Sequence, residues 1–384
     1  MLLGIPPSCQ RWNAQAHSTL RLADKALTDD YARLDIDVAA IVANWRALHA
    51  THDGNPTAAV LKADAYGTGA PQAAAALFAA GCRHFFTAHL AEAIEIRSLV
   101  PSAMLSVLNG PLPGTEAEYA AHDIAPVLGS LADIGWWAGH ARRLGRKLPA
   151  LLHVDTGMAR LGLSPDDVTA LADDPGLLAG IDLLYVMTHL VAADEPASPV
   201  GPAQLRQFAA ACSKLPPAPR SIANSAGLFL GPAFHSDLAR PGAALYGIDT
   251  VPGASMRPVA RLTARVLQVR DVPAGGCVGY NETWRAARAS RIAVLGVGYA
   301  DGFPRALTNR GAAFFDGVRL PLVGRVSMDL TTFDVTDHPG IAAGAWVELL
   351  GPNRPLADVA AEADISPYEM LTRLGRRYAR VWHG

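Results

Sequence analysis

The amino-acid sequence predicts an α/β fold in which a (β/α)8 TIM-type barrel is followed by a mainly β C-terminal domain. Three observations support this prediction: a series of short apolar runs, helix signals between most of these runs, and a β-rich texture after Pro252. The runs are apolar throughout rather than alternating, as is typical of parallel strands buried on both faces. We expect an N-terminal extension over residues 1–30, a barrel over 31–255 and the β domain over 256–384.

The predicted elements begin with a strand and a helix. Leu34, Ile36 and Val38 alternate with other residues as in a strand, and Asp37 can cap the helix that follows. Eight apolar runs then predict the barrel strands at residues 58–61, 84–88, 103–108, 126–128, 149–154, 181–187, 221–223 and 243–247. Because a strand count does not show that a sheet closes on itself, a doubly wound open sheet is the competing topology.

Helix signals separate most of these strands and supply the crossovers that parallel strands need. They lie at residues 71–81, 90–99, 131–144, 164–165 and 204–212, where 164–165 form a cap and a first turn. In the C-terminal part, β-rich runs at residues 262–269, 291–297, 319–323, 330–335 and 346–350 are separated by Gly, Pro and Asp. Two helical pieces at 356–363 and 367–374 precede a last short run that ends at Trp382.

Composition excludes several classes of protein. The 33 Lys and Arg residues are balanced by 35 Asp and Glu residues, so no basic face for nucleic acid is expected. No apolar run reaches the roughly 18 residues of a bilayer span, and the apolar start at residues 1–5 is too short for a secretory signal. The four cysteines, at positions 9, 82, 212 and 277, have neither C-x-x-C nor zinc spacing. We expect a cytoplasmic protein without a metal, nucleic-acid or membrane partner.

Reactive side chains in a barrel gather at the carboxyl ends of its strands. The residues near those ends are Lys62, Asp155, Thr156, Gly157, Arg160, Thr188, His189, Asn224, Ser225, Arg240, Pro241 and Gly242. Ser225 and Gly242 lie where barrels often bind phosphate. A lysine and an anion site are the pair that pyridoxal phosphate needs, because its aldehyde forms an imine with an amine. The alternative is a lysine that pairs with Asp64 or points outward.

The residues around Lys62 form the motif VLKADAYG, at residues 60–67. This motif resembles the cofactor-lysine motif of the alanine racemase family. Further motifs follow in the order that the family has: DTGMARLG (155–162), MTH (187–189), NSA (224–226), RPG through LYG (240–247), GYADG (298–302), SMD (327–329) and PYE (367–369). The resemblance covers residues 31–384, and the ordered set is far more specific than any one motif.

The resemblance implies a pyridoxal-phosphate enzyme that forms a head-to-tail homodimer with shared active sites. It implies that Lys62 holds the cofactor and abstracts the α-proton on one face, while Tyr299 of the other chain serves the opposite face. A racemase needs two bases, because a planar carbanion must be protonated from the side opposite to the one deprotonated. Lysine and tyrosine both have an intrinsic pKa near 10, which their surroundings would lower. His189 would hydrogen-bond Tyr299 and Arg240 and so tune the pair.

The resemblance also implies contacts to cofactor and substrate. Arg240 would face the pyridine nitrogen, and because a guanidinium cannot readily protonate that nitrogen, the ring stays a weaker electron sink. Arg160 would reach the cofactor phenolate and the substrate carboxylate. The phosphate contacts would come from Tyr66, Ser225, Gly242, Ala243 and Tyr368. Met328 and Asp329 would come from the partner chain and line the substrate end.

One position departs from the family pattern. Many members carry, two residues before the aspartate that matches Asp155, a lysine that becomes carbamylated and steadies the arginine. Here that residue is His153. Because an imidazole cannot supply the negative charge of a carbamate, we expect no carbamate in this protein. Arg160 would then be held by a bound anion, an acidic neighbour or water.

These implications predict an isomerase that interconverts L-alanine and D-alanine and supplies D-alanine for peptidoglycan. The alternatives are a broad-specificity amino-acid racemase, a related barrel amino-acid decarboxylase, and a non-catalytic pyridoxal-phosphate-binding protein. A decarboxylase should not keep Arg160 placed to clamp the carboxylate that it must release. A non-catalytic carrier does not need the second domain or Tyr299.

Overall fold

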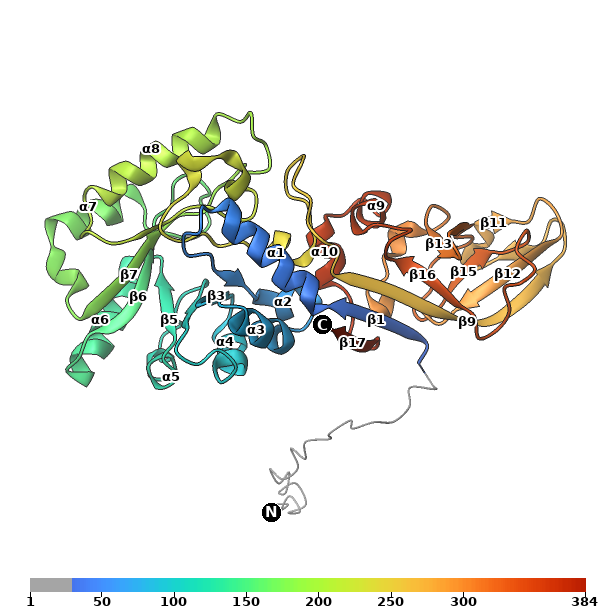
Figure 1. Ribbon diagram of the computed structural model, residues 1–384, viewed down its shortest axis with the longest axis horizontal. Coiled ribbons are helices and arrows are strands. Elements are labelled where there is room, and N and C mark those ends of the chain that lie inside the picture. Colours follow the sequence, from blue (N-terminus) through green and yellow to red (C-terminus); the bar gives the residue numbers. More distant parts are fainter. Residues whose placement is uncertain (1–29) are drawn as a thin grey trace, which may run out of the picture. The chain divides into compact units, whose positions relative to one another are not determined.

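A computed structural model describes residues 30–384, and Tyr31–Gly384 form one compact unit. The expected extension over residues 1–30 lies, apart from Asp30, outside the described residues. The predicted fold class is confirmed, because a parallel strand–helix barrel is followed by a mainly β region (Figure 1). The division of the chain at residues 255 and 256 stays a prediction.

Seven parallel strands form the barrel sheet, and neighbours in the sequence are neighbours in the sheet. In order they are β2 (Ala59–Val60), β3 (His84–Thr87), β4 (Met104–Val107), β5 (Ala125–Leu128), β6 (Leu148–His153), β7 (Ile181–Met187) and β8 (Arg220–Ser221). All four residues of β5 and the last four of β6 are buried, which explains the absence of alternation in the sequence.

The eighth predicted strand is wrong in position. Residues 243–247 do not form a strand; Ala243–Tyr246 form a single 3-10 turn, η4. The segment just before it closes the ring instead. On one side the Leu238 N–H donates to the Arg220 carbonyl, and on the other the Ala58 N–H donates to the Ala239 carbonyl at 2.8 Å. The sheet is therefore a closed barrel, and the doubly wound open topology is excluded.

Helices follow most of the barrel strands and lie outside them (Figure 1). They are α1 (Val38–Thr51), α2 (Lys62–Gly67), α3 (Ala70–Ala79), α4 (Leu90–Arg97), α5 (Glu116–Ala121), α6 (Leu131–Leu144), α7 (Pro165–Asp173) and α8 (Val200–Cys212). The predicted caps are confirmed: an Asp37 carboxylate oxygen accepts the Ala40 N–H, and the Ser164 hydroxyl accepts the Asp167 N–H. The helix predicted over 131–144 has those bounds in the structure.

The second sheet has eight strands and includes β1, the first strand among residues 30–384. Along its path the order is β14 (Val318–Pro321), β13 (Ala312–Phe315), β16 (Trp346–Leu350), β9 (Ala260–Val272), β1 (Ala32–Asp37) and β17 (Ala379–His383), while β12 (Ser290–Leu295) pairs with β9 and β15 (Thr331–Asp334). Strand β1 is antiparallel to β9 and parallel to β17. The described part of the chain thus has its first strand in the second sheet and enters the barrel only after Asp37.

The smaller elements of this region are the strand pair β10 (Cys277–Val278) and β11 (Trp284–Arg285), and the helices α9 (Leu356–Glu362) and α10 (Pro367–Thr372). One polar side chain, Asn44, connects this region to the barrel. The buried Asn44 side chain of α1 donates to the Leu245 and Arg257 carbonyls and accepts the Arg257 N–H. Asn44 therefore fixes the chain where it leaves the barrel for the second sheet.

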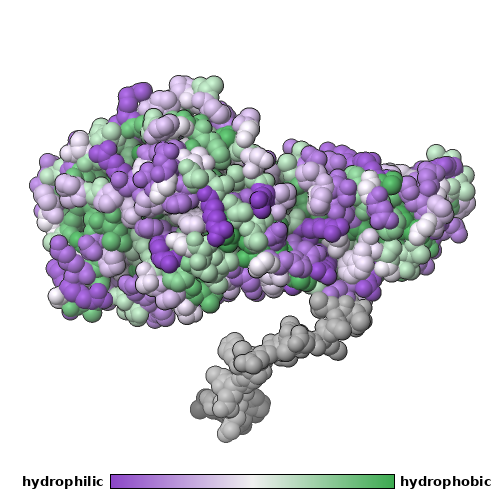
Figure 2. Space-filling view, viewed as in Figure 1, coloured by the Kyte–Doolittle hydropathy of each residue, from purple (hydrophilic) through white to green (hydrophobic). Residues whose placement is uncertain are grey.

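Within residues 30–384, no helix is both long and apolar enough to cross a membrane. On the face drawn in Figure 2, polar and apolar residues are interspersed over the described part of the chain. The large apolar side chains of the first strand and helix are buried instead: Leu34, Ile36, Ile41 and Leu48 are fully inaccessible. Burial of each such side chain contributes about 1.5–3 kcal/mol to folding.

Candidate active site

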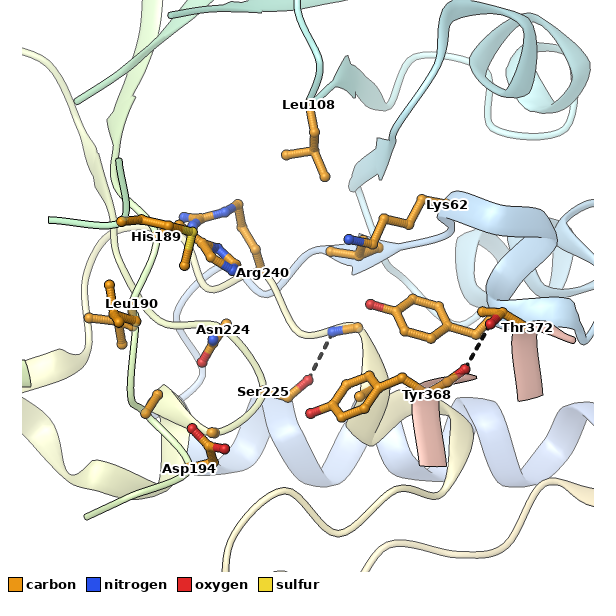
Figure 3. Close-up of a pocket in the computed structure, with 18 of the residues that line it drawn as sticks. Lys62, Leu108, His189, Leu190, Asp194, Asn224, Ser225, Arg240, Tyr368 and Thr372 are labelled. Carbon is orange, nitrogen blue, oxygen red and sulfur yellow. Dashed lines mark hydrogen bonds between the residues drawn. The ribbon is translucent and has the colours of Figure 1, made fainter. Parts of the chain in front are cut away.

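A cavity of about 530 Å³ lies at the carboxyl ends of the barrel strands; we call it the barrel cavity. It brings together nine of the residues singled out in the sequence: Lys62, Tyr66, His189, Asn224, Ser225, Arg240, Gly242, Ala243 and Tyr368 (Figure 3). Eight of them come from the barrel, and Tyr368 comes from α10, which packs against α2. Arg160, Tyr299, Met328 and Asp329 do not line this cavity.

Lys62 enters the barrel cavity directly after β2 (Figure 3). Burial lowers the pKa of its amine below the ordinary value, and the positive charge of Arg160 lowers it further, while the negative charge of Glu92 acts in the opposite direction. A lysine in these surroundings loses its proton more readily than one in water. The amine is thus suited to act as a nucleophile or as a base.

The backbone after Lys62 forms a left-handed turn. Ala63, Asp64, Ala65 and Tyr66 all have φ between 52° and 55°, although none of them is glycine. Such a conformation costs roughly 1–2 kcal/mol for each L-residue, and successive residues rarely adopt it. Strain of this kind persists only where the surrounding structure holds it, which is common at functional sites.

The far end of the left-handed turn is held from β17. Arg380 donates to the Gly67 carbonyl at 2.5 Å, and the Trp382 indole N–H donates to the Thr68 carbonyl at 2.8 Å. The backbone of α10 also packs closely there, since a Cβ placed on Gly67 would lie 2.5 Å from the Leu371 carbonyl oxygen. The last strand of the second sheet therefore supports the turn that presents the lysine.

One end of the barrel cavity is formed by the Ser225 and Tyr66 hydroxyls and the backbone at Gly242; Ser225 is labelled in Figure 3. The buried Ser225 hydroxyl accepts the N–H groups of Gly242 and Ala244, at 2.9 and 3.2 Å. The Tyr66 phenol lies directly on the backbone of Gly242, because a Cβ there would come within 2.4 Å of the Tyr66 oxygen. Burial first, and the neighbouring Tyr368 second, raise the pKa of Tyr66, so that it stays a neutral donor. This end of the cavity suits an anion.

Arg240 forms the buried wall of the barrel cavity, with 4% of its surface exposed. It donates to the Thr188 carbonyl at 2.5 Å and to the Ser221 hydroxyl. Burial lowers the pKa of Arg240 to about 10, so the guanidinium remains a cation at neutral pH. No carboxylate among the described residues forms an ion pair with it, and its positive charge is left to act on the cavity.

His189 is neutral beside this cation. Burial, followed by the charges of Arg240 and Arg160, lowers the pKa of His189 to about 3. Within residues 30–384 its ring makes no hydrogen bond to Arg240 or to Tyr299, so the expected bond between His189 and Arg240 is absent from the single chain. The contact to Tyr299 of a second copy stays a prediction.

A buried glutamine that the sequence did not single out organises the loops around His189. The Gln204 side chain, from α8, donates to the Thr156 hydroxyl and to the His189 carbonyl and accepts the Val191 N–H. The Thr156 hydroxyl in turn bonds that of Thr188 at 2.7 Å. Gln204 thus links the loop after β6 to the loop after β7. Its place within a predicted helix gave no sign of this role.

The structure also describes the position that departs from the family pattern. Burial first and Arg240 second lower the pKa of His153 to about 4, so its imidazole is neutral at neutral pH and carries no charge toward Arg160. Arg160 is exposed and forms no hydrogen bond or ion pair with a described residue. The nearby Asp155 carboxylate instead accepts the N–H groups of Gly157, Met158 and Ala159. Of the three anchors expected for Arg160, an acidic neighbour is therefore not found within residues 30–384.

Tyr299, Met328 and Asp329 lie together in the second domain. The Tyr299 N–H donates to the Ser327 carbonyl at 3.0 Å, and a Cβ on Gly298 would lie 2.3 Å from the Met328 carbonyl oxygen, so the two loops touch. Arg377 joins them, because it pairs with Asp329 at 2.8 Å and with the buried Asp301 at 3.1 Å. We call Tyr299, Met328, Asp329 and Arg377 the Tyr299 patch; 40% of Tyr299 and 54% of Met328 are exposed.

The residues of the barrel cavity fit pyridoxal phosphate. The Tyr66 phenol and the Ser225 hydroxyl both lie against the backbone of Gly242 and offer donors for a phosphate. A partly desolvated lysine lies across the cavity for the aldehyde, and a buried arginine supplies a fixed charge for the ring. Among residues 30–384, no group of three His, Cys, Asp or Glu side chains could hold a metal ion.

Comparisons with known proteins agree in sequence and in structure. Family models described as alanine racemase N-terminal domain and alanine racemase C-terminal domain match residues 36–250 and 259–382. An alanine racemase of Acidiphilium cryptum is 54% identical over 354 residues, covering 92% of this chain and 99% of the relative. One of Brucella abortus is 50% identical over 367 residues, covering 91% and 93%.

Solved structures give the same result. A Bartonella henselae alanine racemase with covalently bound pyridoxal phosphate has a TM-score of 0.89 and 40% sequence identity, covering 92% of this chain and 99% of that chain. A biosynthetic alanine racemase of Pseudomonas aeruginosa has a TM-score of 0.85 and 32% identity, covering 92% and 100%. Each similarity extends through both the barrel and the second domain.

Proposed function

The chain belongs to the alanine racemase family, and on this premise we propose that it interconverts L-alanine and D-alanine in the barrel cavity with two bases. It is a pyridoxal-phosphate-dependent isomerase. The observation that carries the proposal is the pairing, in one cavity, of a partly desolvated lysine with an anion cradle. The same pairing would suit the decarboxylase and the non-catalytic carrier, but the relatives and solved structures that match this chain are alanine racemases, which favours racemisation.

The cofactor-binding residues have separate tasks. Ser225, Gly242 and Ala243 would hold the phosphate through hydroxyl and N–H donors, with Tyr66 and Tyr368 beside them. Arg240, which stays charged, would face the ring nitrogen without giving up a proton. When bound, pyridoxal phosphate withdraws electrons from the substrate Cα and so makes its proton acidic.

Lys62 is the first base that we propose. Its lowered pKa increases the fraction of neutral amine that can take the α-proton. The left-handed turn fixes the point from which the amine acts. The exposed Arg160, with no carboxylate bound to it, is free to pair with the substrate carboxylate through its planar fork.

The second base is Tyr299 of a second copy of the chain. The barrel cavity of one chain contains no tyrosine opposite Lys62 other than the phosphate-end pair Tyr66 and Tyr368. The Tyr299 patch is exposed and already ordered by its own hydrogen bonds. We therefore propose a head-to-tail homodimer in which the patch of each chain completes the cavity of the other, with Met328 and Asp329 at the substrate end. Bulky Tyr299 and Met328 side chains would leave room for little more than a methyl group.

Two experiments test this proposal. Purified protein is assayed for racemisation over a panel of L-amino acids, and alanine should be the best substrate; equal rates on large amino acids would favour the broad-specificity alternative. Borohydride reduction followed by peptide mapping should then place the cofactor on Lys62. Label on Lys25, Lys147 or Lys214, or no label, would contradict the assignment.

The cellular role that we propose is the supply of D-alanine for peptidoglycan in the cytoplasm. The spacing of the cysteines, which suits a reducing compartment, supports this location. Expression of the gene should restore growth, without added D-alanine, to a bacterium that lacks its own alanine racemases. Growth that still depends on added D-alanine, with the protein present and active in lysate, would argue against this role.

A further inference from the structure

Glu92, in the first turn of α4, links two backbone segments beside the barrel cavity. One carboxylate oxygen accepts the Ala63 N–H at 2.7 Å. The other accepts the N–H groups of Ala88 and His89, at 2.9 and 3.0 Å. The carboxylate thus joins the residue directly after Lys62 to the loop that follows β3.

The bond to Ala63 falls at the lysine end of the left-handed turn. Ala63 is the first of the four residues with positive φ, while Arg380 and Trp382 hold the opposite end. Since the left-handed conformation is unfavourable for these residues, contacts from outside must maintain it. On the lysine side, the side chain that makes such a contact among the described residues is Glu92.

The charge of Glu92 also acts on the lysine. The charged groups that face Lys62 are Arg160, which disfavours its protonated form, and Glu92, which favours it. His189, also near Lys62, is neutral, and Arg240 lies beyond it as a cation. Glu92 is thus the negative charge that opposes these cations.

We propose that Glu92 is a positioning residue for Lys62: it clamps the lysine end of the left-handed turn and sets the electrostatic balance at the amine. This inference rests on the role of Lys62 proposed above. The carboxylate does not touch substrate or cofactor in this scheme, and it acts through the Ala63 backbone and through its charge.

Glu92 also belongs to the N-terminal cap of α4, so the test must separate clamping from capping. The variants are Glu92→Ala, which removes the acceptor and the charge, and Glu92→Gln, which keeps an acceptor oxygen of the same reach. Asp167→Asn is the matched capping control, because Asp167 occupies the corresponding position in the cap of α7. Glu95→Gln is the charge control, since Glu95 is exposed on the same helix.

Hydrogen exchange of the holoenzyme, followed by mass spectrometry, tests whether Glu92 holds the left-handed turn in place. In Glu92→Ala the amides of residues 62–67 should exchange about tenfold faster or more, because the Ala63 N–H has lost its acceptor. In Glu92→Gln the increase should be smaller, and in both controls these amides should be unchanged. Faster exchange confined to residues 90–97 in Glu92→Ala would show a helix cap only and overturn the clamp.

The pH–rate profile tests the effect of the Glu92 charge on Lys62. A base must be deprotonated to act, so activity rises with pH through the pKa of that base. Without the negative charge the pKa of the Lys62 nitrogen falls, and in Glu92→Gln the rise should move to lower pH, with kcat reduced more than KM changes. An unmoved profile, equal to that of Glu95→Gln, would overturn the electrostatic part. If the cofactor is mapped to another lysine, the proposed function fails instead, so the two failures are distinguishable.

Discussion

The barrel cavity and the Tyr299 patch differ in how each keeps its groups in place. In the cavity, Arg240 and Tyr66 are at least nine-tenths buried, and burial sets the pKa values of Lys62, His189 and Arg240. In the patch, Tyr299 and Met328 are exposed, and order comes from backbone contacts and the ion pairs of Arg377. Burial within one chain holds the cavity groups, whereas the patch is ordered by surface contacts and stays exposed. The experiments below test this difference between the two regions.

The largest effect is expected in the cavity. Lys62→Ala should abolish racemisation and the visible absorption of bound cofactor, because no other described lysine lines the cavity. The absorption spectrum and an alanine racemisation assay measure both losses. Lys147→Ala, at an exposed position, is the control and should change neither. Retained absorption in Lys62→Ala would place the cofactor elsewhere.

In the patch, Tyr299→Phe should keep the absorption but lower turnover by about 10²- to 10⁴-fold, the range for a lost general acid or base. Deuterium incorporation from heavy water should fall in one direction of the reaction more than in the other. Steady-state kinetics in both directions measure this asymmetry. An unaltered rate would rule out the two-base scheme.

Mixing the two inactive proteins tests whether the regions meet in one site. In a mixed dimer of Lys62→Ala and Tyr299→Phe chains, one site contains both unaltered bases. Random exchange of subunits should therefore restore about a quarter of the normal activity. Native mass spectrometry shows whether mixed dimers form. No recovery in their presence would mean that each site is built from one chain.

A smaller effect is expected from the ion pairs of the patch. Arg377→Leu releases Asp329 and the buried Asp301, and the Tyr299 loop should lose its fixed position, with kcat reduced about tenfold. The free energy of unfolding should fall as well, because the buried Asp301 carboxylate loses its cationic partner. Kinetics and thermal unfolding measure the two quantities. Arg376→Leu, at an adjacent exposed position, should affect neither.

The smallest effect concerns stability in acid. The pKa of His153 is lowered to about 4 in the folded protein, so between pH 6.5 and 4 the unfolded chain binds more protons and stability falls as the pH falls. His153→Asn should reduce this dependence by up to about 1.4 kcal/mol per pH unit. Denaturant unfolding at a series of pH values measures the slope. His122→Asn, at a partly exposed position, is the control, and an equal slope in both variants would contradict the burial of a neutral imidazole.

Much of the fold could be predicted because hydrophobic periodicity and helix capping depend on residues that are close together in the sequence. Helix α6, with a serine cap before it and Gly145 after it, has the predicted bounds. The eighth strand was misplaced because residues 243–247 are apolar for another reason: Ala243–Tyr246 form a buried 3-10 turn that packs against α1. The segment that closes the sheet contains Arg240 and Pro241, and a charged residue followed by proline is more typical of a loop than of a buried strand. Alternation of apolar and polar residues also does not indicate which sheet a strand joins, and β1 joins the second sheet.

The cavity residues lie at the predicted strand ends, but their supports could not be predicted. Glu92 contacts a residue 29 positions away in the sequence, and Gln204 and Arg377 each contact a residue 48 positions away. No local sequence pattern predicts such contacts. The left-handed turn is hidden as well, because Ala, Asp and Tyr do not favour positive φ. Tertiary contacts impose this conformation against local preference.

The place of β1 governs the order in which the protein can be completed during synthesis. Leu34 and Ile36 pair with Arg380 and Trp382, nearly 350 positions later. At about 5–20 residues per second, a ribosome releases β1 roughly 20–70 seconds before β17 exists. Throughout that interval a strand with two fully apolar side chains has no parallel neighbour, and it must be shielded or stay unpaired. The second sheet can therefore be completed only after β17 has been made, although β1 is the first strand of the described residues.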